Sequence, residues 1–276
     1  MIEFDGISKR FADGTIAVRD FSLRIPSRRT TVFVGSSGSG KTTLLRMINR
    51  MVDPSAGRVL IDGEDIAALD PVKLRRGIGY VMQNSGLLPH RTVLQNIATV
   101  PLLNGMPRAA AHERALELMD TVGLDRAQAG RYPGQLSGGQ QQRVGVARGL
   151  AVDPNILLMD EPFGAVDPIV RRELQAELLR LQSTLGKTVV FVTHDIDEAF
   201  LLGDEVVILS RGGQIAQRGT PEEILANPES EFVAEFIGAD RGRRALTLRE
   251  TDGRTVVVDG EGRIAGVLSA EGGATR

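Results

Sequence analysis

Residues 31–42 read Thr31-Val32-Phe33-Val34-Gly35-Ser36-Ser37-Gly38-Ser39-Gly40-Lys41-Thr42, an apolar run that ends in a glycine-rich turn. A helix is expected directly after this turn, because apolar residues recur on one helical face at Leu44, Leu45, Ile48 and Met51. Glycines let backbone amides converge on phosphate oxygens, and the start of the helix adds positive potential. A merely flexible Gly/Ser turn would not require this strand–helix context. The stretch therefore predicts a phosphate-binding loop.

The residue types in the loop indicate how a nucleoside phosphate would be held. Lys41 is expected to reach the β- and γ-phosphates, and the Thr42 hydroxyl is expected to ligate Mg²⁺. The residues expected around the phosphates are Gly35, Ser36, Ser37, Gly38, Ser39, Gly40, Lys41, Thr42 and Thr43.

Strands and helices alternate along most of the chain, which predicts an α/β fold with a mainly parallel sheet. Residues 156–159 and 189–192 are two more short apolar runs that end at polar residues, as buried strands do. Between residues 105 and 130 a helical stripe forms at Ala115, Leu118, Met119 and Val122, which suggests a helical insertion. A hairpin is expected from 206–209 to 214–217 across Arg211-Gly212-Gly213.

Composition excludes several classes of protein. The 276 residues include 33 Lys plus Arg and 35 Asp plus Glu, a net charge of -2 that does not favour nucleic-acid binding. Cysteine is absent, so disulfides, Cys-ligated zinc and thiol catalysis are excluded. No apolar run approaches the roughly 20 residues of a membrane helix, and the N-terminus is not of the signal-peptide type. These features predict a cytoplasmic protein that reaches a membrane only through a partner.

Asp160 and Glu161 form the second chemical motif, at the carboxyl end of the apolar run 156–159. Ligands of open α/β sheets bind at this edge. Asp160 is expected to hold Mg²⁺, and Glu161 is expected to polarise the water that attacks the γ-phosphate. A solvated acidic strand end is common by itself, but the accompanying phosphate loop favours the catalytic interpretation.

The third motif is LSGGQQQR at residues 136–143. Ser137 is suited to cap the helix that follows, and Gly138 and Gly139 leave the backbone amides unobstructed. This predicts a second anion-binding helix N-terminus, although the chain has only one phosphate loop. LSGGQQQR resembles the signature motif of ABC-transporter ATPases, and the resemblance extends over residues 1–238 with the family's motifs in order.

The resemblance implies a P-loop NTPase of the ABC cassette type, with a mainly parallel core sheet, an antiparallel β subdomain and a helical insertion at about 88–150. It implies that two chains bind ATP and Mg²⁺ head to tail, with Ser137, Gly138, Gly139 and Gln140 of one chain facing the γ-phosphate held by the other. Phe11 would stack on adenine, Gln83 would contact Mg²⁺ and the attacking water, and His194 would contact the γ-phosphate. Asp167 would lie in the D-loop, where Gly164-Ala165-Val166-Asp167 departs from the commoner Ser-Ala-Leu-Asp.

The segments around the Gln83 loop suggest what the ATPase powers. GLLPHRTVLQNIATVPLLNG at 86–105 and RMINRMVDPSAGRVLIDGEDI at 46–66 look like the ATPases of glycine betaine, choline and related osmoprotectant importers. The resemblance implies integral-membrane permease subunits as partners, a solute-binding protein as an indirect one, and a place on the inner face of the cell membrane. An amino-acid, sulfonate or nitrate importer is the alternative.

Residues 239–276 are expected to form a charged linker and a tail with a short β-hairpin. TVVVDGEGRIAGVLS at 255–269 resembles the strand–turn–strand of one CBS repeat, although a hairpin that only packs on the chain is an equal reading. A DNA-acting ABC ATPase would need a long coiled-coil insertion between the phosphate loop and the signature. A ribosome-acting protein of this kind usually carries two cassettes, so a non-transport function is less favoured.

Overall fold

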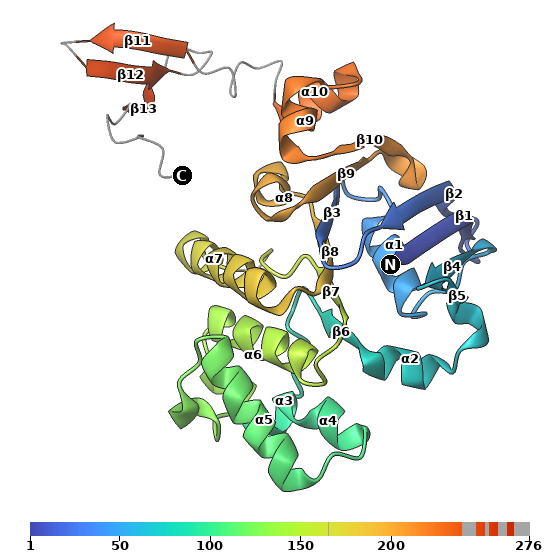
Figure 1. The fold of residues 1–276 in the computed structure, drawn as a ribbon, viewed down its shortest axis with the longest axis vertical. Helices are drawn as coiled ribbons and strands as arrows, with labels where there is room; N and C mark the ends of the chain where they lie inside the picture. The colour runs from blue at the N-terminus through green and yellow to red at the C-terminus, as the bar shows by residue number, and fades with distance from the viewer. Residues whose placement is uncertain (165, 239–246, 252–253, 259–263, 268–276) are drawn as a thin grey trace. The chain divides into compact units, whose positions relative to one another are not determined.

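The computed structural model describes residues 1–164, 166–238, 247–251, 254–258 and 264–267. The chain divides into two compact units, Met1–Pro221 and Glu222–Arg276 (Figure 1). The phosphate loop, the two acidic residues and the signature motif all belong to the first unit. In the part of the chain that the structure describes, no helix is long and apolar enough to cross a membrane.

A six-stranded sheet forms the centre of the first unit. Its strands lie in the order β10 (Ile215–Gly219), β9 (Glu205–Leu209), β3 (Thr30–Gly35), β8 (Thr188–Thr193), β7 (Ile156–Asp160) and β6 (Ile78–Val81). All neighbours are parallel except β9 and β10, which form the expected antiparallel hairpin. Every residue of β3, β7 and β8 is buried, as the continuous apolar runs predicted.

An antiparallel sheet and one helix complete the core. The strand order is β2 (Ile16–Ile25), β1 (Ile2–Arg10), β4 (Ala56–Ile61) and β5 (Glu64–Asp65). Helix α1 (Lys41–Ile48) packs its buried Leu44 and Leu45 into a cluster that draws residues from both sheets. Phe4, Phe21 and Phe33 meet in that cluster, with ring centroids 5.3–6.5 Å apart. The predicted antiparallel subdomain is therefore confirmed.

The predicted helical insertion consists of α3 (Val93–Ile97), α4 (Thr99–Leu103), α5 (Arg108–Thr121) and α6 (Gly138–Leu150) (Figure 1). Ala115, Leu118 and Met119 are buried on α5, and Val122 is buried just after it, as the helical stripe predicted. The remaining helices of the first unit are α2 (Pro71–Gly77), α7 (Pro168–Leu185) and α8 (Ile196–Leu202).

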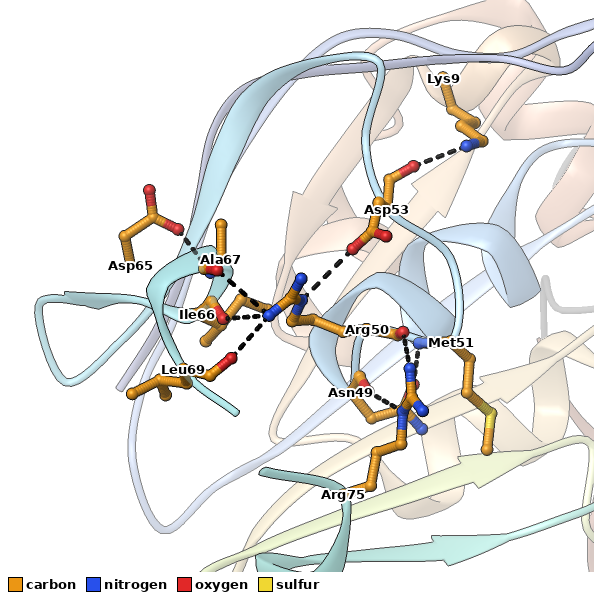
Figure 2. Close-up of polar contacts among 10 residues, drawn as sticks. All are labelled: Lys9, Asn49, Arg50, Met51, Asp53, Asp65, Ile66, Ala67, Leu69 and Arg75. Atoms are coloured by element: carbon orange, nitrogen blue, oxygen red, sulfur yellow. Dashed lines mark hydrogen bonds and ion pairs between the residues drawn. The ribbon is translucent and has the colours of Figure 1, made fainter. Parts of the chain in front are cut away.

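Helix α1 ends earlier than its apolar pattern predicted. Met51 lies beyond the helix and is 51% exposed, so its assignment to the buried face was wrong. The reason is Arg50, which turns the chain with a left-handed φ of 54° and donates to the carbonyl oxygens of Ile66, Ala67 and Leu69. Arg75 of α2 donates in turn to the Asn49 and Arg50 carbonyls (Figure 2). These contacts join the end of α1 to the segment that leads into β6.

The second unit contains α9 (Pro221–Ala226) and α10 (Glu231–Ile237), followed by β11 (Thr247–Thr251), β12 (Arg254–Val258) and β13 (Ile264–Val267). The expected tail hairpin corresponds to β12 and β13, which pair antiparallel. The structure adds β11 as a third strand, paired with β12. The linker at 239–246, the turn at 259–263 and residues 268–276 lie outside the described residues.

Candidate functional site

The loop between β3 and α1 folds around the side chain of Lys41. The Lys41 Nζ atom donates to the Gly35 and Ser36 carbonyls at 2.8 and 2.9 Å, and only 5% of the residue is exposed. Burial lowers the pKa of Lys41 below its ordinary 10.5, while the charges of Glu161 and Asp160 act in the opposite direction. The Ser39 hydroxyl is a third contact at 3.5 Å, and a buried cation whose hydrogen-bond partners are all neutral oxygens is well suited to meet an anion.

Position 40, the N-cap of α1, requires glycine for two reasons. Its φ is 91°, and a Cβ atom there would lie 2.6 Å from the Ala17 carbonyl oxygen. Because no side chain caps this helix, the amides of its first turn have no side-chain acceptor. The loop therefore leaves the positive end of α1 open to a ligand.

Asp160, the last residue of β7, lies against the start of α1. The Thr42 hydroxyl donates to Asp160 Oδ1 at 2.9 Å, and Asp160 is 6% exposed. A hydroxyl and a carboxylate oxygen so placed form a donor set that suits a hard cation such as Mg²⁺. The two residues that the sequence assigned to Mg²⁺ from separate motifs are thus in contact.

Glu161 is the centre of the second group of predicted residues. Its φ of 45° is unusual for a non-glycine residue, and its amide donates to the Val192 carbonyl at 3.0 Å. Glu161 Oε2 lies 3.2 Å from His194 Nδ1 and 3.4 Å from Gln83 Nε2. Gln83 and His194 therefore converge on one carboxylate oxygen of Glu161, and the three residues follow three different strands.

A cavity of about 340 Å³ lies between the phosphate loop and the pair Glu161–His194, and it is lined by Ser37, Gly38, Gly40, Lys41, Thr42, Thr43, Glu161 and His194. It lies at the carboxyl ends of β3, β7 and β8. A larger cavity of about 520 Å³ lies at the opposite ends of the strands, where Ile78, Ile156 and Thr188 begin β6, β7 and β8. We assign the function to the smaller cavity, because ligands of open α/β sheets bind at the carboxyl ends.

The signature motif forms the start of α6, as predicted. Ser137 Oγ accepts from the Gln140 amide at 3.3 Å, and Gln140 Oε1 accepts from the Ser137 amide at 3.0 Å, a reciprocal capping box. Ser137 and Gly138 are exposed, whereas Gly139 is buried and a Cβ there would lie 2.3 Å from Val170 Cγ1. Ser137–Gln140 lie outside the described lining of the phosphate-loop cavity.

Of the other predicted residues, Gln83 and Asp160 lie just outside that lining and contact its members Glu161 and Thr42, and the loop residues Gly35, Ser36 and Ser39 are also outside it. Phe11 and Asp167 lie outside it as well. Phe11 is 39% exposed, with Lys9 Nζ 5.3 Å from the centroid of its ring. Asp167 caps α7 by accepting from the Ile169 amide at 2.9 Å. The neighbouring Ala165 of the D-loop motif is outside the described residues. Among the residues that the structure describes, the lining of this cavity thus includes neither the predicted adenine-stacking Phe11, nor the signature residues Ser137–Gln140, nor Asp167.

The sequence analysis missed two sets of contacts around the site. Arg148 of α6 donates to the carbonyls of Ser85 and Gly86, two and three residues after Gln83, both at 2.7 Å. Burial lowers the pKa of Arg148. Tyr80 and Arg46 both contact Asp160. A signal was available for Arg46, which lies four residues after Thr42 and so shares its helical face.

Known proteins resemble this chain in sequence. The sequence profile described as ABC transporter matches residues 18–164. The choline transport ATP-binding protein OpuBA of Bacillus subtilis is 53% identical over 87% of this chain and 63% of its own length. The glycine betaine uptake system ATP-binding protein YehX of Escherichia coli is 49% identical over 90% of this chain and 80% of its own.

A solved structure resembles the chain as well. The ATP-binding cassette MJ0796, in a dimeric post-hydrolysis state bound to ADP and Pi, is 34% identical with a TM-score of 0.73, covering 80% of this chain and 99% of that one. The chain spans less than two thirds of the length of OpuBA, so their likeness concerns the shared part.

Proposed function

This chain belongs to the ABC transporter family, and we propose that it hydrolyses ATP in the cavity at the carboxyl ends of β3, β7 and β8. The observation that carries the proposal is the convergence of two groups on one cavity. Lys41 and the open start of α1 supply positive charge, and Glu161, with His194 and Gln83 on one oxygen, supplies a base.

The residues of the cavity would divide the chemistry between them. Lys41 and the loop amides would neutralise charge on the transferred phosphoryl group, which is the main requirement of phosphoryl transfer. Glu161 would accept the proton of the attacking water. His194 and Gln83 would hold the carboxylate of Glu161 in place, because both contact its Oε2 atom.

Magnesium fits the same site. Thr42 and Asp160 would hold it, and the amide oxygen of Gln83 is a third candidate because its Nε2 atom faces Glu161. When bound, Mg²⁺ would neutralise phosphate charge and orient the phosphate oxygens.

We further propose that the active assembly is a head-to-tail homodimer. The argument is that the signature helix start is exposed and lies away from the phosphate-loop cavity of its own chain. A head-to-tail arrangement with two-fold symmetry would bring each signature to the partner's cavity and make two equivalent sites. ATP would then close the dimer, and hydrolysis would let it reopen.

The transported solute is proposed to be glycine betaine, choline or a related quaternary amine. The support is the similarity to OpuBA and YehX, whose names specify choline transport and glycine betaine uptake. The chain would act on the inner face of the cell membrane, through permease subunits and a solute-binding protein.

Uptake of labelled glycine betaine, choline and proline, at low and high osmolarity, tests the transport proposal. Cells would carry the chain in its own operon, as wild type or with Glu161→Gln. Osmolarity-stimulated betaine or choline uptake that the variant abolishes is the expected result. Phosphate release from ATP by the purified chain, without uptake of any of these solutes by cells, would retain the ATPase and overturn the solute class.

A further inference from the structure

The two oxygens of the Asp160 carboxylate have different partners. Oδ1 accepts from Thr42, at the start of α1 and on the side of the phosphate loop. Oδ2 accepts from the Tyr80 hydroxyl at 3.1 Å and from Arg46 Nη2 at 3.4 Å. Because Asp160 is 6% exposed, protein groups rather than bulk solvent set the orientation of this carboxylate.

The fold places these partners from two elements. Tyr80 lies on β6 opposite Leu158 of β7, and Asp160 is two residues further along the same face of that strand. Thr42 and Arg46 are four residues apart on α1 and lie on one face of it. Helix α1 therefore contacts both oxygens of Asp160, while Tyr80 reaches Oδ2 from the neighbouring strand.

The hydrogen-bond directions in this group are fixed by chemistry. Arg46 Nε lies 3.4 Å from the Tyr80 oxygen, and a guanidinium can only donate. The phenol oxygen accepts this bond, which leaves its own hydrogen for Asp160 Oδ2. Oδ2 thus receives two donors, and the lone pairs of Oδ1 remain directed to the side of Thr42.

We propose that Tyr80 and Arg46 are positioning residues that turn Oδ1 of Asp160 toward the magnesium of a bound Mg–ATP, an inference that rests on the proposed function. Groups that orient a ligating carboxylate contribute to metal affinity without touching the metal. Tyr80 and Arg46 therefore determine the Mg²⁺ concentration that half-saturates the site. They do not affect the binding of ATP in the absence of Mg²⁺.

The chain provides a spectroscopic test, because it contains two tyrosines and no tryptophan. In a Tyr132→Phe background, Tyr80 is the sole source of intrinsic fluorescence at tyrosine wavelengths. A phenol that donates to a carboxylate is quenched, and a cation on that carboxylate weakens it as an acceptor. Addition of Mg²⁺ in the presence of ATP should therefore increase Tyr80 emission, and ATP with a chelator should not.

The second test compares Tyr80→Phe with Tyr132→Phe, which removes the hydroxyl of the other tyrosine. Equilibrium dialysis of labelled ATP against increasing Mg²⁺ gives the half-saturating Mg²⁺ concentration. We expect about a tenfold increase for Tyr80→Phe and for Arg46→Met, and no change for Tyr132→Phe. Binding of ATP in chelator should be equal in all of them.

The outcomes separate this inference from the proposed function. Mg²⁺-dependent ATP binding by the parent chain, with unchanged Tyr80 emission and an unchanged Mg²⁺ requirement in Tyr80→Phe, would overturn the positioning role alone. Failure of the parent chain to bind ATP with Mg²⁺ would overturn the proposed function and the inference with it. The emission test uses the native Tyr80, so it does not depend on whether Tyr80→Phe folds.

Discussion

Helices α1 and α6 both have glycine-rich N-termini, and these two N-termini are capped in opposite ways. Helix α1 begins at Gly40 with a left-handed φ of 91° and no side-chain cap, and its first residue, Lys41, bends back over the loop. Helix α6 begins at Ser137 with a complete capping box, in which Ser137 and Gln140 satisfy each other's amides. Both are predicted to meet a γ-phosphate, α1 that of the ATP in its own chain and α6 that of the ATP in the partner chain.

The difference indicates what each start does before a ligand arrives. The first-turn amides of a helix require acceptors. The first-turn amides of α1 lie in a cavity with a buried cation, so a bound anion would supply most of the hydrogen-bond acceptors of this N-terminus. The start of α6 is already ordered by its own side chains and is exposed, so it is a preformed surface that a second chain can bring to the phosphate.

The largest expected effect is on turnover, through the residues of the phosphate-loop cavity at the N-terminus of α1. Glu161→Gln should lower turnover on the order of 10²–10³-fold, because the group that accepts the proton of water is lost. ATP binding should persist, since Lys41 and the loop are untouched. Phosphate release and dialysis of labelled ATP measure the two quantities. The control is Glu113→Gln, an exposed carboxylate of α5. Near-normal turnover in Glu161→Gln would show that another group is the base.

The second prediction tests whether the two helix starts act in different chains. Lys41→Ala removes the cation of the phosphate loop at the N-terminus of α1. Gly138→Asp places a negative charge at the N-terminus of α6, where nothing lies within 4 Å of the added Cβ. Each variant should be nearly inactive alone. If a dimer contains two such sites, an equal mixture should regain about a quarter of wild-type turnover through mixed dimers with one intact site.

Gly138→Ala is the matched control for the mixing experiment, because it adds the Cβ without the charge. A mixture that stays as inactive as its components would mean that both helix starts serve one chain, which contradicts the head-to-tail dimer.

The third prediction concerns the contact between the two regions within one chain. Arg148 of the signature helix is the donor to the Ser85 and Gly86 carbonyls that follow Gln83. Arg148→Met leaves both carbonyls without it, and should lower the free energy of unfolding by about 2–4 kcal/mol. Urea denaturation measures it. Arg148→Lys retains the charge but offers one donor nitrogen in place of the two that reach the carbonyls, and should lose roughly half as much. Equal stability of all three would mean that these bonds do not hold the Gln83 loop.

The sequence predicted the α1 side of this comparison more completely than the α6 side. The loop, Asp160 and Glu161 belong to motifs that the residues themselves indicate, and Gln83 and His194 were implied by the family resemblance. Parallel strands bring the carboxyl ends that carry these residues to one edge. The contacts of Arg148 and Tyr80 were missed because they depend on which buried groups meet across elements. Met51 was misplaced for a similar reason, because α1 ends at Ile48 and Arg50 just beyond it bonds to carbonyls 16 to 19 residues later.

The smallest expected effect is a difference in the pH dependence of stability between two variants. One removes Lys41, the buried cation at α1, and the other removes Ser137, the neutral cap of α6. Because burial places the pKa of Lys41 below 10.5, the unfolded chain binds more protons than the folded chain between that lowered pKa and 10.5. The contribution of Lys41 to the free energy of unfolding therefore rises with pH through this window. Below the window, Lys41 is charged in both states, and the folded chain bears the full cost of burying that charge. Lys41→Met removes the rise, so its stability gain over wild type should be greatest at low pH and shrink toward pH 10.

Ser137→Ala supplies the other half of that contrast. Loss of the cap should lower the free energy of unfolding by about 1 kcal/mol, and by the same amount at every pH, because no titratable group is involved. Urea denaturation of both variants between pH 7 and 10 measures the two dependences. ATP should reduce the pH dependence that Lys41 causes, since phosphate favours the protonated amine and raises its pKa. A pH-independent difference for Lys41→Met would mean that the buried amine is already matched by the carboxylates of Glu161 and Asp160, and that the α1 start is as complete without a ligand as the α6 start.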